Sequence, residues 1–151
     1  MTAPAHSARS LFVTMPVADV ARSTAFFTDL GFRFNPAFSD DETAACILVG
    51  EQASVMLVGP EKFAEHSKRP AADPATHALA LYSFGVASRD EVDAVSAAAL
   101  AAGAVEADGA EDHGFMYSRS FFDLDGHGWQ VMWMDPAAAQ PAPQDEVAAS
   151  A

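Results

Sequence analysis

The sequence predicts an α+β fold in which one βαβββ module occurs twice along a chain of 151 residues. Two strand-like segments, LFVTMPVAD (residues 11–19) and ALYSFGVAS (residues 80–88), align with each other and open the two halves. Each is followed by a helical spacing of side chains that ends at a glycine. Each half then closes with strand-like segments before a proline, so the same order of elements is predicted twice.

The first module is predicted over residues 10–67. Its helix begins after Asp19, a residue type that caps helix N-termini, and ends at Gly31, which suits a left-handed C-cap. The helical face is formed at three- and four-residue spacing by Val20, Thr24, Phe27 and Leu30. The following strands are expected at residues 32–38, 43–50 and 54–59, before the short segment EKFAEHSK.

The second module is predicted over residues 77–136, after a Pro-rich linker at residues 68–76. Ser88 is the expected N-cap of its helix, and Gly103 the expected stop. The helical face comprises Val92, Val95, Ala99 and Ala102, and the later strands are expected at residues 104–107, 115–123 and 129–134. Residues 1–9 and 137–151 are predicted to be flexible tails, the latter disordered because it lacks core-forming side chains.

Composition excludes several function classes. The formal net charge of −13 disfavours nucleic acids and anionic membrane surfaces, whose phosphates the protein would repel. The sequence shows neither an apolar run long enough for a membrane helix nor a signal peptide, and its single cysteine, Cys46, suits a reducing compartment. We therefore expect a cytoplasmic protein that binds neither nucleic acid nor membrane.

Three stretches carry a resemblance to a known superfamily. They are FSDDETAACILV (residues 38–49), VMLVGPEKF (residues 55–63) and HGFMYSRSFFDLDGHGWQVMWMDP (residues 113–136). They resemble the vicinal-oxygen-chelate superfamily of glyoxalases, bleomycin-resistance proteins, extradiol dioxygenases and epimerases, especially a bacterial branch labelled predicted lactoylglutathione lyase. The resemblance implies a curved mixed sheet, or half-barrel, with helices outside, a ligand on the concave face, and a homodimer.

The same resemblance implies four metal-ligand positions, which fall at Phe12, Met56, Leu81 and Gln130 in this chain. Metal-dependent relatives carry His or Glu there, whereas this chain offers carbon, sulfur and one neutral amide. A divalent ion needs several oxygen or imidazole donors. We therefore expect neither a metal nor another cofactor, and the DLDG run at residues 123–126 is interpreted as a hairpin turn instead of a calcium loop.

The hairpin predicts which side chains share the concave face. If Asp125 and Gly126 form a two-residue turn, the expected pairs are Phe121–Gln130, Arg119–Met132 and Tyr117–Met134, all on one side of the sheet. The resemblance, through the position of Gln130, implies that this is the concave side. The opposite side would then receive Phe122, Trp129, Val131 and Trp133, beneath the helices. The predicted cavity is apolar with a few polar groups, and its candidate residues are Phe12, Thr14, Met56, Leu81, Ser83, Tyr117, Arg119, Phe121, Gln130 and Met132.

Such a lining favours a small, partly apolar organic ligand bound without a metal. Arg119 either clamps a ligand carboxylate or pairs with an acidic residue or a dimer partner, and the methionines are interpreted as filler. Two alternatives stay open: a glyoxalase-type lyase or another enzyme of the superfamily, and a structural or partner-binding domain with a filled cavity. No catalytic residue is identified: His113 is a candidate general base beside Asp112, but adjacent side chains on an extended chain point in opposite directions.

Overall fold

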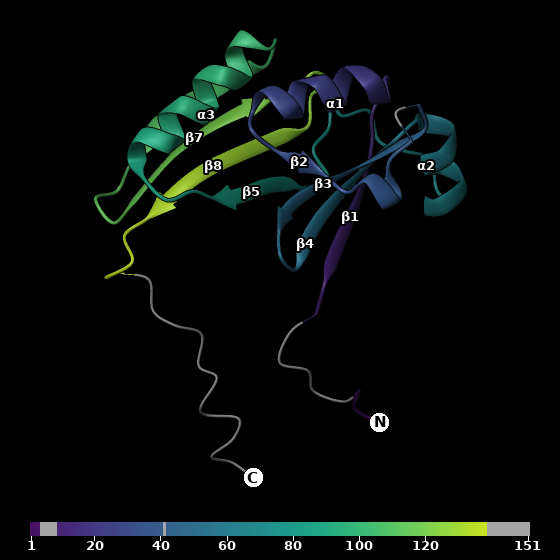
Figure 1. Cartoon of the computed structure of the whole chain (residues 1–151), viewed down its shortest axis with the longest axis horizontal. Helices are drawn as coiled ribbons and strands as arrows, with labels where there is room; N and C mark the ends of the chain where they lie inside the picture. The colour runs from purple at the N-terminus through teal and green to yellow at the C-terminus, as the bar shows by residue number, and fades with distance from the viewer. Residues whose placement is uncertain (4–8, 41, 139–151) are drawn as a thin grey trace.

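The computed structural model describes residues 1–3, 9–40 and 42–138. Within that part of the chain the strands form two mixed four-stranded sheets, which together make an open half-barrel (Figure 1). The order of strands in the first sheet is β1 (Leu11–Pro16), β4 (Ala53–Val58), β3 (Ala44–Gly50) and β2 (Arg33–Phe34). The order in the second is β5 (Leu81–Gly85), β8 (Gly128–Met134), β7 (Met116–Phe122) and β6 (Val105–Asp112).

The two sheets have the same topology, which confirms the predicted repeat. In each, the opening strand is parallel to the last strand of its module, and the remaining pairs are antiparallel. The helices α1 (Val20–Asp29) and α3 (Arg89–Ala101) follow the opening strands and lie on the same side of the half-barrel (Figure 1). A third helix, α2 (Pro60–Ser67), follows β4 and lies beside β1.

The predicted helix ends are confirmed. The side chain of Asp19 accepts a hydrogen bond from the backbone N–H of Arg22, and the side chain of Ser88 accepts one from Glu91. These caps satisfy N–H groups that have no partner within the helix. At the other ends Gly31 and Gly103 have φ values of 93° and 109°, where a side chain would be strained.

The two modules share one hydrophobic core beneath α1 and α3. Phe27 of α1 packs its ring 5.0 Å from that of Trp129 on β8, and Phe26 lies 6.4 Å from Phe121 on β7. The side chains of Trp129, Phe121 and Phe27 are almost completely buried. Aromatic pairs of this kind add to the stability gained by burying their area, so the core fastens one module to the other.

Two predicted strands differ from the structure. The strand expected at residues 32–38 is limited to Arg33–Phe34, because Pro36 has no N–H for a ladder and begins a short 3-10 helix, η1 (Pro36–Phe38). The side chain of Asn35 caps that turn by accepting from the N–H of Ala37. The strand expected at residues 104–107 is longer, because β6 continues alongside β7 through two register shifts.

A five-residue turn between β7 and β8, Asp123–His127, joins the modules. One carboxylate oxygen of Asp123 accepts three backbone N–H bonds within the turn, of 3.0–3.1 Å, and the other accepts the indole N–H of Trp129 at 2.9 Å. From this turn Asp125 accepts the N–H of Ala18 at 2.8 Å, and Nε2 of His127 donates to the carbonyl of Pro16 at 2.7 Å. The end of β1 is therefore held by a turn of the second module.

Most of each predicted tail lies outside the described residues. Of the N-terminal tail the structure describes residues 1–3 and 9, and of the C-terminal tail residues 137 and 138. No helix in the described ranges is long and apolar enough to cross a membrane.

The substitution Gly126→Ala tests how tightly the turn packs against the linker. A Cβ atom at Gly126 would lie 2.7 Å from the carbonyl oxygen of Pro74, and the φ of 101° adds backbone strain. Gly31→Ala is the matched control, since its φ is 93° but no atom lies within 4 Å of the added Cβ. In urea titrations we expect Gly31→Ala to lose about 1–2 kcal/mol of unfolding free energy. Gly126→Ala should lose a further amount of about 1–3 kcal/mol through the overlap; equal losses would contradict the close packing.

Candidate functional site

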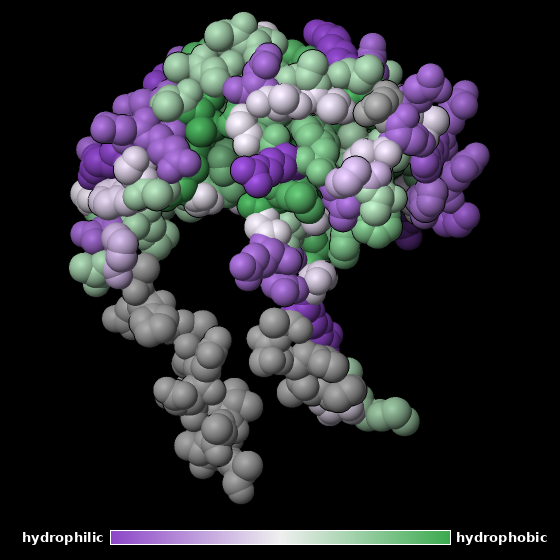
Figure 2. Space-filling model, in the orientation of Figure 1, coloured by the Kyte–Doolittle hydropathy of each residue, from purple (hydrophilic) through white to green (hydrophobic). Residues whose placement is uncertain are grey.

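The concave face is the side of the two sheets that points away from α1 and α3, and Figure 2 shows the surface hollowed there. On β1, Val13 and Met15 pack into the core, so the alternating residues Phe12 and Thr14 point to the concave face. On β5, Tyr82 and Phe84 pack toward the core, and their neighbours point the other way. The predicted residues that lie on this face are Phe12, Thr14, Met56, Leu81, Ser83, Gln130 and Met132.

Gln130 is not free on this face. Its side-chain oxygen accepts a hydrogen bond from the hydroxyl of Ser83 at 3.2 Å, across the parallel pair of β5 and β8. Phe12 and Leu81 are more than half exposed, at 56% and 59%. Exposed apolar side chains of β1 and β5 and the neutral pair of Ser83 and Gln130 therefore share this face.

The predicted hairpin register is wrong by one residue. The turn has five residues, because the Asp123 carboxylate gathers the N–H groups of residues 125–127, and the strands pair from Phe122 and Gly128 onward. A shift of one residue moves each side chain to the other face of a strand. Phe122, which was expected beneath the helices, therefore lies on the concave face, whereas Trp129, Val131 and Trp133 lie beneath the helices as predicted.

Three predicted cavity residues consequently lie on the helix side of the second sheet. Phe121 is 1% exposed in the core. The guanidinium of Arg119 lies 2.7 Å from Glu106 and 3.5 Å from Asp93, and these carboxylates raise its pKa. The hydroxyl of Tyr117 donates to Asp93 at 2.7 Å, which raises the pKa of the phenol. Of the two roles considered for Arg119, pairing with acidic residues is the one observed.

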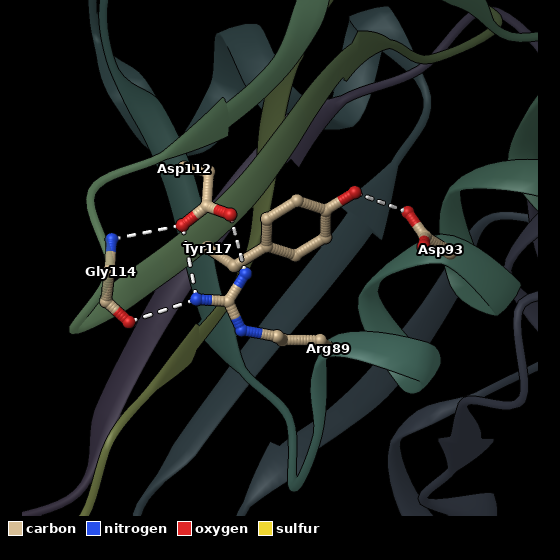
Figure 3. Close-up of polar contacts among 5 residues, drawn as sticks. All are labelled: Arg89, Asp93, Asp112, Gly114 and Tyr117. Carbon is tan, nitrogen blue, oxygen red and sulfur yellow. Dashed lines mark hydrogen bonds and ion pairs between the residues drawn. The ribbon is translucent and has the colours of Figure 1, made fainter.

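A second arginine organises the same side of the module (Figure 3). Arg89, the first residue of α3, donates to both carboxylate oxygens of Asp112, at 2.7 and 3.0 Å, and to the carbonyl of Gly114. Its guanidinium carbon lies 5.2 Å from the ring centre of Tyr117 and 5.0 Å from that of Trp133. These bidentate and cation–π contacts tie α3 to the β6–β7 hairpin, so we interpret the cluster as structural.

A cavity of about 600 Å³ lies where the two modules meet, and we call it the seam cavity. Its walls come from the end of β1, the start of β5, α2, the β7–β8 turn and the linker. The lining residues are Thr14, Pro16, Phe63, Ala71, Ala72, Pro74, Ala75, Thr76, His77, Ala78, Leu79, Ala80, Leu81, Tyr82, Phe122, Gly126, His127 and Gly128. The volume lies within the range of ordinary small-molecule sites.

The seam cavity contains Thr14 and Leu81 from the predicted set, together with residues that the sequence did not indicate. The polar groups in its wall include the phenol of Tyr82 and the imidazole of His127. Burial and the nearby Asp123 carboxylate raise the pKa of Tyr82, so this hydroxyl keeps its proton and can donate a hydrogen bond. His127 already uses Nε2 toward Pro16, which leaves its other ring nitrogen for a different partner.

The four positions implied for a metal do not fit one. Phe12, Met56 and Leu81 present carbon and a thioether, and the amide of Gln130 is engaged with Ser83. A hard divalent ion requires several oxygen or imidazole donors that converge. Among the residues that the structure describes, no three His, Cys, Asp or Glu side chains are grouped closely enough to hold an ion.

Comparison with solved structures decides the fold. A glyoxalase/bleomycin resistance protein/dioxygenase family enzyme from Burkholderia phytofirmans superposes with a TM-score of 0.69 at 15% identity, over 82% of this chain and 96% of that one. The chain has the glyoxalase/bleomycin-resistance fold. A hypothetical protein from S. aureus shares this fold at a TM-score of 0.71 and 24% identity, over 85% and 95% of the two chains.

Other comparisons agree with this fold assignment. A lactoylglutathione lyase from Agrobacterium tumefaciens has a TM-score of 0.59 at 18% identity, over 85% of this chain and 94% of that chain. Residues 9–50 match the model of the bleomycin resistance protein-like N-terminal family. No curated protein matches the sequence of this chain. The fold that the resemblance implied is confirmed. The reactions and ligands named for these proteins are not thereby shown for this chain.

The Arg89–Asp112 pair predicts a specific acid sensitivity. Hydrogen bonding to Arg89 lowers the pKa of Asp112 from 3.8 to about 2 in the folded chain. Because the folded pKa is depressed, this contribution is present above the unfolded value and is lost as the pH falls from about 4 to 2. We expect the urea midpoint of Asp112→Asn to fall less than that of the wild type as the pH is lowered over that interval. An unchanged pH slope would contradict the role of the pair.

Proposed function

We propose that the protein binds a small, largely apolar organic molecule in the seam cavity, without a bound metal ion. The observation that carries the proposal is the cavity itself: about 600 Å³ with mostly apolar walls, drawn from both modules and the linker. Ligand sites commonly combine such walls with a few polar groups that orient the ligand. Here Thr14, Tyr82 and His127 supply those groups.

The chemistry of the donor positions supports binding without a metal. The residues at the four implied positions are three apolar side chains and one hydrogen-bonded amide. Relatives of this fold bear several names, among them a fosfomycin resistance protein from Listeria monocytogenes and a lactoylglutathione lyase. A shared fold does not transfer an activity, so the proposal rests on the cavity and not on these names.

Thermal-shift measurements with a library of apolar fragments test the proposal, each run with and without EDTA. We expect some fragments to raise the melting temperature, and EDTA to change neither the apo nor the bound value. Leu81→Trp should abolish these shifts by filling the cavity. The control Met134→Trp lies on the same face of the second sheet, is 41% exposed and does not line the cavity. A melting temperature lowered by EDTA would refute the metal-free proposal, and equal effects of both variants would refute the location.

We also propose a homodimer, as the resemblance implies. Phe12, Ser54 and Leu48 form a row across the concave face of the first sheet, and both apolar members are at least 40% exposed. A second copy of the chain would cover this row, because exposed apolar groups favour burial against a partner.

Light scattering during size-exclusion chromatography tests the dimer. We expect twice the chain mass of 15.9 kDa, and a shift to the monomer mass in Phe12→Asp. The control is Phe38→Asp, which changes a comparably exposed phenylalanine on η1. A monomeric wild-type protein at micromolar concentration would contradict the proposal.

A further inference from the structure

We infer that the ligand of the seam cavity is uncharged, with a flat apolar body and one or two hydrogen-bonding oxygens or nitrogens. This inference rests on the proposed function and deepens it by excluding a chemical class. Carboxylates, sulfonates, phosphates and phosphonates would not bind in the cavity. Three observations support this: the described lining has no lysine, arginine, aspartate or glutamate, the adjoining β7–β8 turn carries carboxylates, and the polar groups in the lining include uncharged hydroxyls.

The titratable side chains in the described lining are those of Tyr82, His77 and His127. No lysine, arginine, aspartate or glutamate lines the cavity in the described part of the chain. An anion that enters an apolar site without a cationic partner loses its hydration and gains no ion pair, so its binding is disfavoured. A cation would also lose its hydration, and the described lining contains no carboxylate to pair with it directly.

The arginines of the second module are committed elsewhere. The guanidinium groups of Arg89 and Arg119 pair with Asp112, Asp93 and Glu106 on the helix side of the second sheet. They lie on the opposite side of that sheet from Leu81 and Phe122. A ligand carboxylate in the seam cavity is therefore out of reach of both guanidinium groups.

The β7–β8 turn behind one wall of the cavity carries negative charges. The turn that supplies Gly126 and His127 to the cavity also carries the carboxylates of Asp123 and Asp125, which point into the turn and toward α1. The whole chain has a net charge of −13. These carboxylates and the net charge oppose the approach of an anion, and the lining in the described part of the chain contains no lysine or arginine to pair with it.

The groups that the walls do expose suit a neutral ligand. The aromatic side chains of Phe63, Tyr82 and Phe122 are among the lining residues and supply apolar ring surface. The hydroxyls of Thr14 and Tyr82 have no hydrogen-bond partner among the described residues. They are available to a carbonyl, ether or hydroxyl oxygen of a ligand, and such bonds need no counter-charge.

Two fluorescent probes that differ by one charged group test the inference on the full chain. N-phenyl-1-naphthylamine is neutral, and 8-anilino-1-naphthalenesulfonate has the same ring skeleton with a sulfonate added. We expect saturable binding of the neutral probe and an affinity for the sulfonate at least about tenfold weaker, a difference of about 1.4 kcal/mol. Binding is followed by probe fluorescence at fixed ionic strength.

A charge introduced into the wall provides the reciprocal test. Leu81→Lys should lower the affinity for the neutral probe and raise the affinity for the sulfonate. Met134→Lys is the matched control, since it adds the same charge to the same face outside the cavity, and it should change neither affinity by more than about twofold. Both leucine and methionine are exposed there, so the variants are expected to fold.

The outcomes separate the two proposals. Sulfonate binding as tight as, or tighter than, that of the neutral probe overturns the inferred ligand class while the proposed binding function stands. Failure of both probes to bind, in the wild type and in Leu81→Lys alike, overturns the proposed function and this inference with it. Weak sulfonate binding that Leu81→Lys strengthens supports the inference.

Discussion

The carboxylate of Asp123 determines the geometry on which the rest of the second module depends. It is largely buried, and burial raises its pKa, yet it accepts four N–H bonds that hold the turn and the indole of Trp129 in place. Because the turn is fixed, Asp125 and His127 reach the end of β1 in the other module. The same turn supports the linker at Pro74. The Asp123 side chain therefore stabilises the turn that sets the hairpin register, that contacts the first module and that forms one wall of the seam cavity.

The fold was predictable because its signals are local and occur twice. Asp19 and Ser88 cap their helices through the same side-chain hydrogen bond, and Gly31 and Gly103 end them in the same left-handed conformation. Each signal depends on a few neighbouring residues, so it can be read without knowledge of distant contacts. Pro36 is the informative exception, since its missing N–H shortens a strand that the apolar pattern had extended.

The concave face was harder to predict because it depends on whether a turn has an even or an odd number of residues. The Asp-Gly pair indicated a two-residue hairpin, but the carboxylate of Asp123 competes for the same N–H groups and makes a turn of five. That difference exchanged the faces of Tyr117, Arg119 and Phe121 with those of their neighbours. The positions on β1 and β5 were placed correctly, because their faces follow from core residues within the same strand.

The seam cavity escaped sequence reasoning for a different physical reason. β1 and β5 are edge strands of their sheets in the described structure, so the space between them belongs to neither module. Side chains from both faces of an edge strand reach such a space, and Tyr82, which packs on Trp129, lines it together with Leu81. The linker then closes the space with small and cyclic residues that carry no helical or strand periodicity. Of the four positions that the resemblance implied for a metal, Leu81 lines this cavity, whereas Phe12, Met56 and Gln130 do not.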